Sequence, residues 1–221
     1  MKYPHALAGV KLIFAAAVIA LIGSVCGSVL LLNLYLSTPG ILQGIVPEEN
    51  GVSVSDMLFL LLGMLVSVLN FSALVLQLIG SAKAAKDENT FKAVIYMISV
   101  GLVVSLISAV FGSNSKIVGI TNLISEFIDL FVSIYIVQGV IVLAGKLNNS
   151  EVEVKGERLY KLMIAIYSTV ILVQLFTMVF NGTGIQMAAG VLTTLSGMLS
   201  LLEYAIYLLF LRKAKAMLAQ S

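Results

Sequence analysis

The residues of this chain that could support chemistry are a few carboxylates and amides within long apolar segments. The stretch SEFIDLF, residues 125 to 131, places Glu126 and Asp129 three positions apart, so both carboxylates lie on one face of a helix. Two close carboxylates can bind a cation or share a proton. They can also form a hydrated outer rim of a helical bundle, and the sequence favours this rim over a cation or substrate entry site.

Glu203 is the carboxylate that lies deepest in an apolar segment. It precedes Arg212 by nine residues, which at ~1.5 Å per residue places it about 13 Å inside the basic end of that segment. A carboxyl at that depth of a membrane costs about 2.5–3.5 kcal/mol, so we expect Glu203 to point into the protein. It is then either protonated and hydrogen-bonded to Asn70 or Gln174, or ionised beside water or a cation, and the protonated structural role is favoured.

Together, Asn70, Asp129, Gln174 and Glu203 form the candidate polar site within the apolar segments. For the two amides the expected role is an interhelical hydrogen bond worth roughly 0.6 kcal/mol. Enzyme chemistry is not indicated, because the chain has a single histidine, His5, and no metal-ligand, phosphate-loop or nucleophile-elbow motif. We therefore expect a non-enzymatic protein with no cofactor and no metal.

Membrane-spanning helices must position these side chains. The 221 residues are 60% hydrophobic and only 11% charged, whereas a soluble domain has about 25% charged residues. Crossing the hydrocarbon takes about 20 apolar residues. The chain has six such segments, at roughly 11–36, 57–82, 92–113, 119–145, 161–181 and 187–211. The predicted fold is an all-α polytopic membrane bundle of six transmembrane helices, forming a single transmembrane domain over residues 1–221.

The basic residues predict the orientation of this bundle. Of the 13 Lys and Arg residues, all but Lys116 lie in the termini and in the second-to-third and fourth-to-fifth connections. Because cytoplasmic loops are enriched in Lys and Arg, both termini are expected in the cytoplasm. The net charge of +2 then reflects topology, so the lipid bilayer is the expected partner and nucleic acid is not.

The chain also predicts three repeated helical hairpins, at about 11–86, 92–149 and 161–217. The sequences SAVFGSNS and TMVFNGTG lie at the ends of the third and fifth segments and are 69 residues apart. Lys92 and Lys161, at the starts of those segments, are also 69 residues apart. The last two hairpins are therefore expected to superpose with Phe111 on Phe180.

Small residues recur about one turn apart in the first segment, which we expect to be a retained helix rather than a cleaved signal. Ala16, Ala20, Gly23 and Gly27 form a candidate helix-packing face. Packing within the protein is favoured, and docking of a partner membrane protein or a second copy is the alternative. The Ala-x-x-x-Ala pattern is similar to the first helix of the substrate-binding subunits of vitamin transporters, which implies such a docking face.

Longer stretches carry a second resemblance. GVKLIFAAAVIALIG, VVSLISAVFGSNS, and YIVQG followed by VIVLAGKLNNSEVEVKGERLYKL resemble a group of small six-span integral membrane proteins of Gram-positive bacteria. The resemblance covers most of the chain, implies the bacterial plasma membrane, and brings no catalytic residues or known function. The expected role is a non-enzymatic accessory or structural subunit. The alternative is a small-solute or ion transporter, or the substrate-binding subunit of a transporter.

Overall fold

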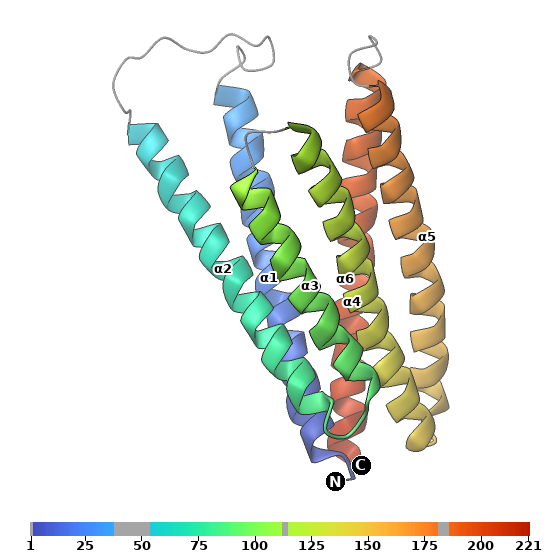
Figure 1. Ribbon diagram of the computed structural model, residues 1–221. Coiled ribbons are helices and arrows are strands. Elements are labelled where there is room, and N and C mark those ends of the chain that lie inside the picture. Colours follow the sequence, from blue (N-terminus) through green and yellow to red (C-terminus); the bar gives the residue numbers. More distant parts are fainter. Residues whose placement is uncertain (1, 38–53, 112–114, 181–185) are drawn as a thin grey trace. The chain divides into compact units, whose positions relative to one another are not determined.

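The computed structural model describes residues 2–37, 54–111, 115–180 and 186–221, and this part of the chain is helical with short links (Figure 1). The prediction of an all-α protein is confirmed. Its helices are α1 (Pro4–Ser37), α2 (Val54–Ala84), α3 (Thr90–Val110), α4 (Ser115–Lys146), α5 (Ser150–Phe180) and α6 (Gln186–Gln220).

Four stretches of these helices are long and apolar enough to cross a membrane. They are Pro4–Gly27, Leu60–Ala84, Thr90–Val110 and Gly119–Lys146, within the described residues. Helices of this length and composition indicate a membrane protein.

Exposed hydroxyl groups on the helices are satisfied by their own backbone. Ser67, Ser99 and Thr169 each donate a hydrogen bond of 2.9 Å to the carbonyl oxygen four residues earlier. Lipid hydrocarbon offers no water to such groups, so they must be satisfied within the protein. This bonding therefore suits helix faces that contact hydrocarbon.

The chain divides into two compact units. The first unit comprises residues 1–14 and 78–221, and the second comprises residues 15–77. Helix α1 thus begins in the first unit and continues in the second, and α2 does the reverse.

In the second unit, α1 and α2 approach closely through the small residues of α1. A Cβ atom at Gly23 would lie 2.7 Å from Asn70 Oδ1, and one at Gly27 would lie 3.8 Å from Val66 Cγ1. The predicted packing face of α1 therefore lies against α2 at these glycines. Ala16 is buried and Ala20 is half-buried.

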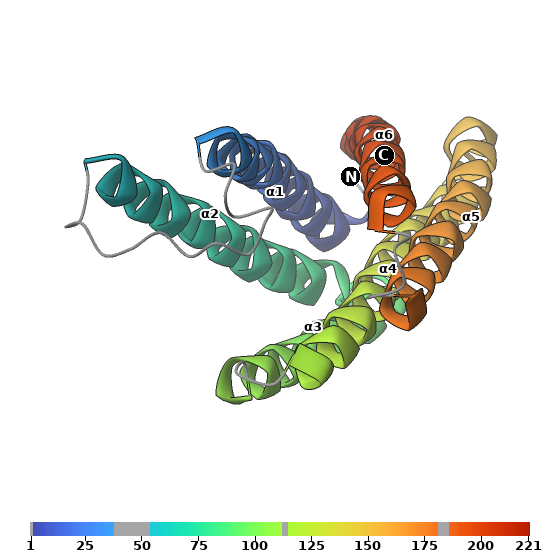
Figure 2. The ribbon, with the colours of Figure 1, turned by 90° about the horizontal axis from the view of Figure 1, so that it is seen from above.

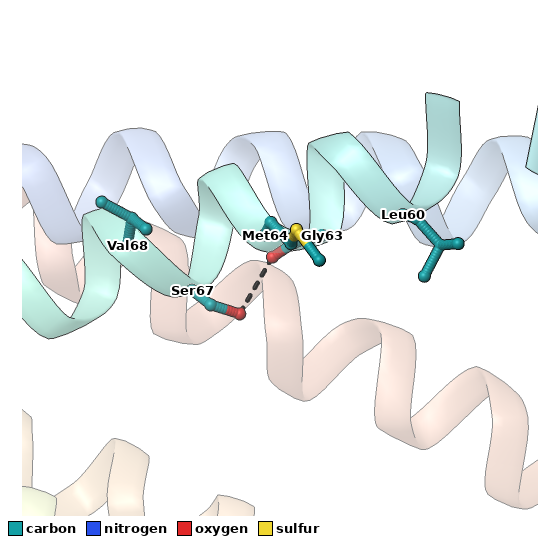
Figure 3. Close-up of a pocket in the computed structure, with 5 residues that line it drawn as sticks. All are labelled: Leu60, Gly63, Met64, Ser67 and Val68. Carbon is teal, nitrogen blue, oxygen red and sulfur yellow. Dashed lines mark hydrogen bonds between the residues drawn. The ribbon is translucent and has the colours of Figure 1, made fainter. Parts of the chain in front are cut away.

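One face of α2 is exposed and carries large apolar side chains (Figure 3). Leu60, Met64 and Val68 are each more than half exposed, and Gly63 and Ser67 lie between them. The Ser67 hydroxyl donates to the Gly63 carbonyl, so this face presents no unsatisfied polar group to its surroundings.

In the first unit, α4 packs between α3 and α5, and α6 packs against α5 with a smaller contact to α4 (Figure 2). Glycines allow the close contacts. The Phe91 ring of α3 is fully buried beside Gly139 of α4, where a Cβ atom would lie 2.6 Å from the ring. Gly156 of α5 also allows a close contact. A Cβ atom added there would lie 2.5 Å from Ile141 Cγ1 of α4 and 3.1 Å from Phe210 Cζ of α6.

A three-residue link turns the chain between α4 and α5. Asn148 adopts a left-handed conformation with φ of 52°, and the Asn149 amide donates 2.9 Å to the Ala144 carbonyl. This arrangement closes a helix C-terminus, and Asn tolerates the positive φ better than most residues. The Asn149 side chain then caps α5 by accepting a 3.1 Å hydrogen bond from the Val152 amide.

The link between α2 and α3 is tied to the end of α4. Glu88 is buried, and its carboxylate accepts hydrogen bonds from Lys146 Nζ at 2.5 Å and from the Thr90 hydroxyl at 2.9 Å. Burial alone would raise the pKa of Glu88, but the hydrogen bonds from Lys146 and Thr90 outweigh it and lower the pKa below the ordinary value.

Both chain termini lie at this same end of the first unit (Figure 1). The Asp87 carboxylate accepts a 2.7 Å hydrogen bond from the Ala6 amide, which places a negative charge at the N-terminus of α1. Near the C-terminus, Lys215 Nζ lies 4.7 Å from the centre of the Phe14 ring. The first contact ties the N-terminal end of α1 to the link between α2 and α3, and the second joins the C-terminal part of α6 to α1.

The repeat of helical hairpins predicted from the sequence remains a prediction, and the bounds of α3 and α5 correspond at their C-terminal ends but not at their starts. α3 ends at Val110, one residue before Phe111, and α5 ends at Phe180. However, Lys92 is the third residue of α3, whereas Lys161 is the twelfth residue of α5. The cap at the α4–α5 link extends α5 toward its N-terminus, and superposition of the hairpins remains a prediction.

Candidate functional site

The predicted polar residues are divided between the two units. Glu126 and Asp129 of α4 and Glu203 of α6 belong to the first unit, whereas Asn70 of α2 belongs to the second. Gln174 lies in α5, but its side chain is outside the described residues. The structure therefore places these three carboxylates in one unit and Asn70 in the other.

Glu203 is buried, with 3% of its surface exposed. Among the described residues it forms no ion pair, because all three ion pairs there involve Glu88 or Glu151. A buried carboxylate without a countercharge is costly. Its environment must therefore supply a proton or a cation.

Three tyrosines lie within electrostatic range of this carboxyl group. Tyr167 of α5 and Tyr204 and Tyr207 of α6 all interact electrostatically with Glu203. Tyr167 is also hydrogen-bonded to the side chain of Ser133 on α4. The site therefore connects α4, α5 and α6, and its members are Glu126, Asp129, Ser133, Tyr167, Glu203, Tyr204 and Tyr207. We call these seven residues the tyrosine–carboxylate cluster.

The cluster results from helical spacing and from the register of the helices. Glu203 and Tyr207 are four residues apart, and Glu126, Asp129 and Ser133 follow one another at intervals of three and four, so each set shares a helix face. Gly156, packed against both α4 and α6, holds α5 close to its two neighbours. This contact places the three faces at a common level.

The hydroxyl group of Tyr207 has no hydrogen-bond partner in the described part of the structure. Tyr207 is only 4% exposed, and its ring lies 5.9 Å from that of Tyr204 at an angle of 54°. Leaving a buried hydroxyl unpaired costs about 1–3 kcal/mol. Such a group points to a ligand or a water molecule that would complete its bonding.

Asp129 connects this buried region to an accessible surface. Its side chain is exposed, and Glu126 on the same face is half-buried. Asp129 nevertheless interacts electrostatically with Tyr167 and Tyr204. Both of these tyrosines also interact electrostatically with Glu203. The cluster therefore extends from an exposed carboxylate to a buried one.

The cluster combines carboxylates with tyrosine rings, and both kinds of side chain can interact with cations. No group of three or more His, Cys, Asp or Glu side chains in the described residues is placed to hold a metal ion. Tyrosine rings attract cations through their faces, and aromatic cages recognise ammonium groups. The combination of carboxylates and tyrosines therefore suits a cation with a diffuse charge, such as an organic amine.

Sequence reasoning identified the carboxylates but not the tyrosines or Ser133. A signal was present, because Tyr204 and Tyr207 lie one and four residues after Glu203 in an otherwise apolar helix. Tyr167 could not be assigned to the site without the register between α5 and α6.

Comparison with known proteins adds no assignment. The chain matches no protein-family model, no curated protein and no solved structure.

Proposed function

We propose that this protein binds a small organic cation within the membrane and acts as a transporter or as the substrate-binding subunit of one. One observation carries the proposal: buried Glu203, which has no ion pair in the described residues, lies one helical turn from Tyr207, whose buried hydroxyl has no hydrogen-bond partner among those residues. A bound ammonium group would neutralise the carboxylate, and a donor or acceptor on the solute would satisfy the hydroxyl. The protein has no enzymatic step in this role.

Each part of the cluster has a function in this proposal. Glu203 is the countercharge of the ammonium group, and the rings of Tyr167, Tyr204 and Tyr207 provide cation–π contacts. Asp129, which is exposed, forms the entrance and raises the local concentration of cations. The Ser133 hydroxyl positions Tyr167 through their hydrogen bond.

The proposed topology has six spans in a bacterial plasma membrane, with both termini in the cytoplasm and three repeated hairpins. Two observations support it. The termini lie at one end of the first unit, together with the Glu88–Lys146 ion pair and the α4–α5 link (Figure 1). In addition, the exposed Thr169 hydroxyl of α5 is satisfied by its own backbone, which suits a fifth span in lipid.

An accessory role for this protein is less well supported than transport. The small-residue face of α1, which was the candidate docking surface, packs on α2 at Gly23 and Gly27. The polar cluster, by contrast, has no evident need in a purely structural subunit, since apolar residues would pack α4, α5 and α6 without the cost of burying Glu203.

A ligand panel measured by thermal unfolding in detergent tests the proposal. The panel contains methylammonium, tetramethylammonium and choline as cations, acetate as an anion, and glycerol as a neutral solute. Ligands that bind only the folded state raise its stability. We expect one or more organic cations to raise the melting temperature, and acetate and glycerol to leave it unchanged. Stabilisation by the anion or the neutral solute alone, or by no cation, would contradict the proposal.

A further inference from the structure

A second site lies at the basic end of the first unit, between α5 and α6. There the two helices border a groove with a volume of about 320 Å3. Its lining includes three cationic side chains, Lys155, Arg158 and Lys213, and three aliphatic ones, Leu162, Ile206 and Leu209. No member of the tyrosine–carboxylate cluster lines this groove.

The lining changes from charged to apolar along the helix axis. Helix α5 runs from Lys155 to Leu162 over seven residues, a rise of about 10 Å, while α6 runs antiparallel from Ile206 to Lys213 over the same length. The lysines of both helices therefore lie at one end of the groove, and Leu162 and Ile206 lie at the other. Leu209 is 60% exposed, so the apolar wall is open to the surroundings.

The charged end carries an excess of positive charge. Glu151 accepts hydrogen bonds from Lys155 and from Lys213, the latter at 3.0 Å, and these two lysines hold its pKa at about 2. One carboxylate thus offsets one of the two lysines. Arg158 is exposed and forms no ion pair within the described residues, so its guanidinium group is available to a ligand.

We propose that this groove binds one anionic phospholipid. The phosphate group is held by Arg158 together with Lys155 and Lys213, and an acyl chain lies along Leu162, Ile206 and Leu209. The order of charged and apolar lining matches the order of headgroup and chain in a lipid. Basic pockets between membrane helices are suited to anionic headgroups, and arginine pairs with phosphate in a bidentate manner.

Native mass spectrometry of the full chain in detergent tests this assignment. The probes are phosphatidylglycerol and phosphatidylcholine with identical acyl chains, each titrated at known concentration. We expect phosphatidylglycerol to bind preferentially, and Arg158→Gln to weaken its binding about fivefold. Lys92→Gln removes one exposed cation from α3, which does not line the groove, and should change the affinity less than twofold.

A second pair of variants tests the acyl part of the site. Leu209→Asn should weaken the binding of both lipids, whereas Leu60→Asn, at an equally exposed position of α2, should not. Equal binding of the two lipids would overturn the proposal, as would equal losses in Arg158→Gln and Lys92→Gln. Full displacement of the lipid by millimolar inorganic phosphate or by a polyglutamate peptide would also overturn it, because the groove would then recognise the anion alone.

Discussion

The close contact between Gly139 and Phe91 makes a quantitative prediction for Gly139→Ala. The new methyl group would lie 2.6, 2.7 and 3.0 Å from three atoms of a fully buried ring. A rigid ring in a packed site cannot yield easily, so overpacking should cost about 2–3 kcal/mol. Alanine regains about 1 kcal/mol of helix propensity. The net loss is about 1–2 kcal/mol, or roughly 2–8 °C in melting temperature for a chain of this size.

Thermal unfolding in detergent, followed by circular dichroism, measures this loss. Gly63→Ala is the matched control, because among the described residues no atom outside the local helix backbone lies within 4 Å of a Cβ at Gly63. It should leave the melting temperature unchanged or slightly higher. Phe91→Leu removes the atoms that clash, so Gly139→Ala should cost at least 0.5 kcal/mol less in that background. The reasoning is refuted if Gly139→Ala is as mild as Gly63→Ala, or if its cost is the same with Leu at position 91.

Three further predictions concern charge and topology. Glu88→Gln should lose about 1–2 kcal/mol of stability at pH 7. Because the folded state lowers the pKa of Glu88, its carboxylate stabilises the protein above the unfolded pKa, about 4.3, and this gain is lost as pH falls through the folded value. Unfolding of both proteins between pH 7 and pH 3 should therefore show the gap closing, and a gap that widens contradicts the ion-pair account. The free energy of unfolding of Glu203→Gln should lie within about 1 kcal/mol of the parent value. Glu203→Leu should lose about 1 kcal/mol more, because it would leave polar neighbours of Glu203 unsatisfied. Equal losses in the two variants would show that no polar neighbour depends on Glu203. Alkaline phosphatase fused after Ser221 should be inactive and a fusion at residue 45 active, and the reverse pattern would invert the proposed topology.

The helices could be predicted from the sequence because the lengths of the apolar segments determine them. Five of the six predicted starts lie within seven residues of the helices observed. The exception is α5, which begins at Ser150 rather than near Lys161. The charges in its first turns predict a loop, but the Asn149 cap and the burial of Val152 and Leu159 extend the helix.

The candidate site was only partly predictable, since its members come from three helices. Glu203 and Asp129 were recognisable as charges in apolar segments. Which residues of α5 they would meet depends on helix register, and register is set by contacts such as Gly156 against Ile141. Similarly, α1 and α2 approach closely at Gly9 and Gly80, where added Cβ atoms would meet backbone oxygens at 2.4 and 2.8 Å. Single glycines in apolar helices do not reveal their partners in advance.

Direct binding of a permanently charged amine tests the central claim, that the tyrosine–carboxylate cluster is a cation site. Radiolabelled tetramethylammonium, whose charge does not vary with pH, is measured by equilibrium binding to the purified protein and to two variants. Glu203→Gln removes the buried charge, and Glu157→Gln removes an exposed charge of the same sign from α5. We predict saturable binding to the parent and to Glu157→Gln, with at least a tenfold weaker affinity for Glu203→Gln. Equal affinity of all three proteins, or an equal loss in both variants, would contradict the account.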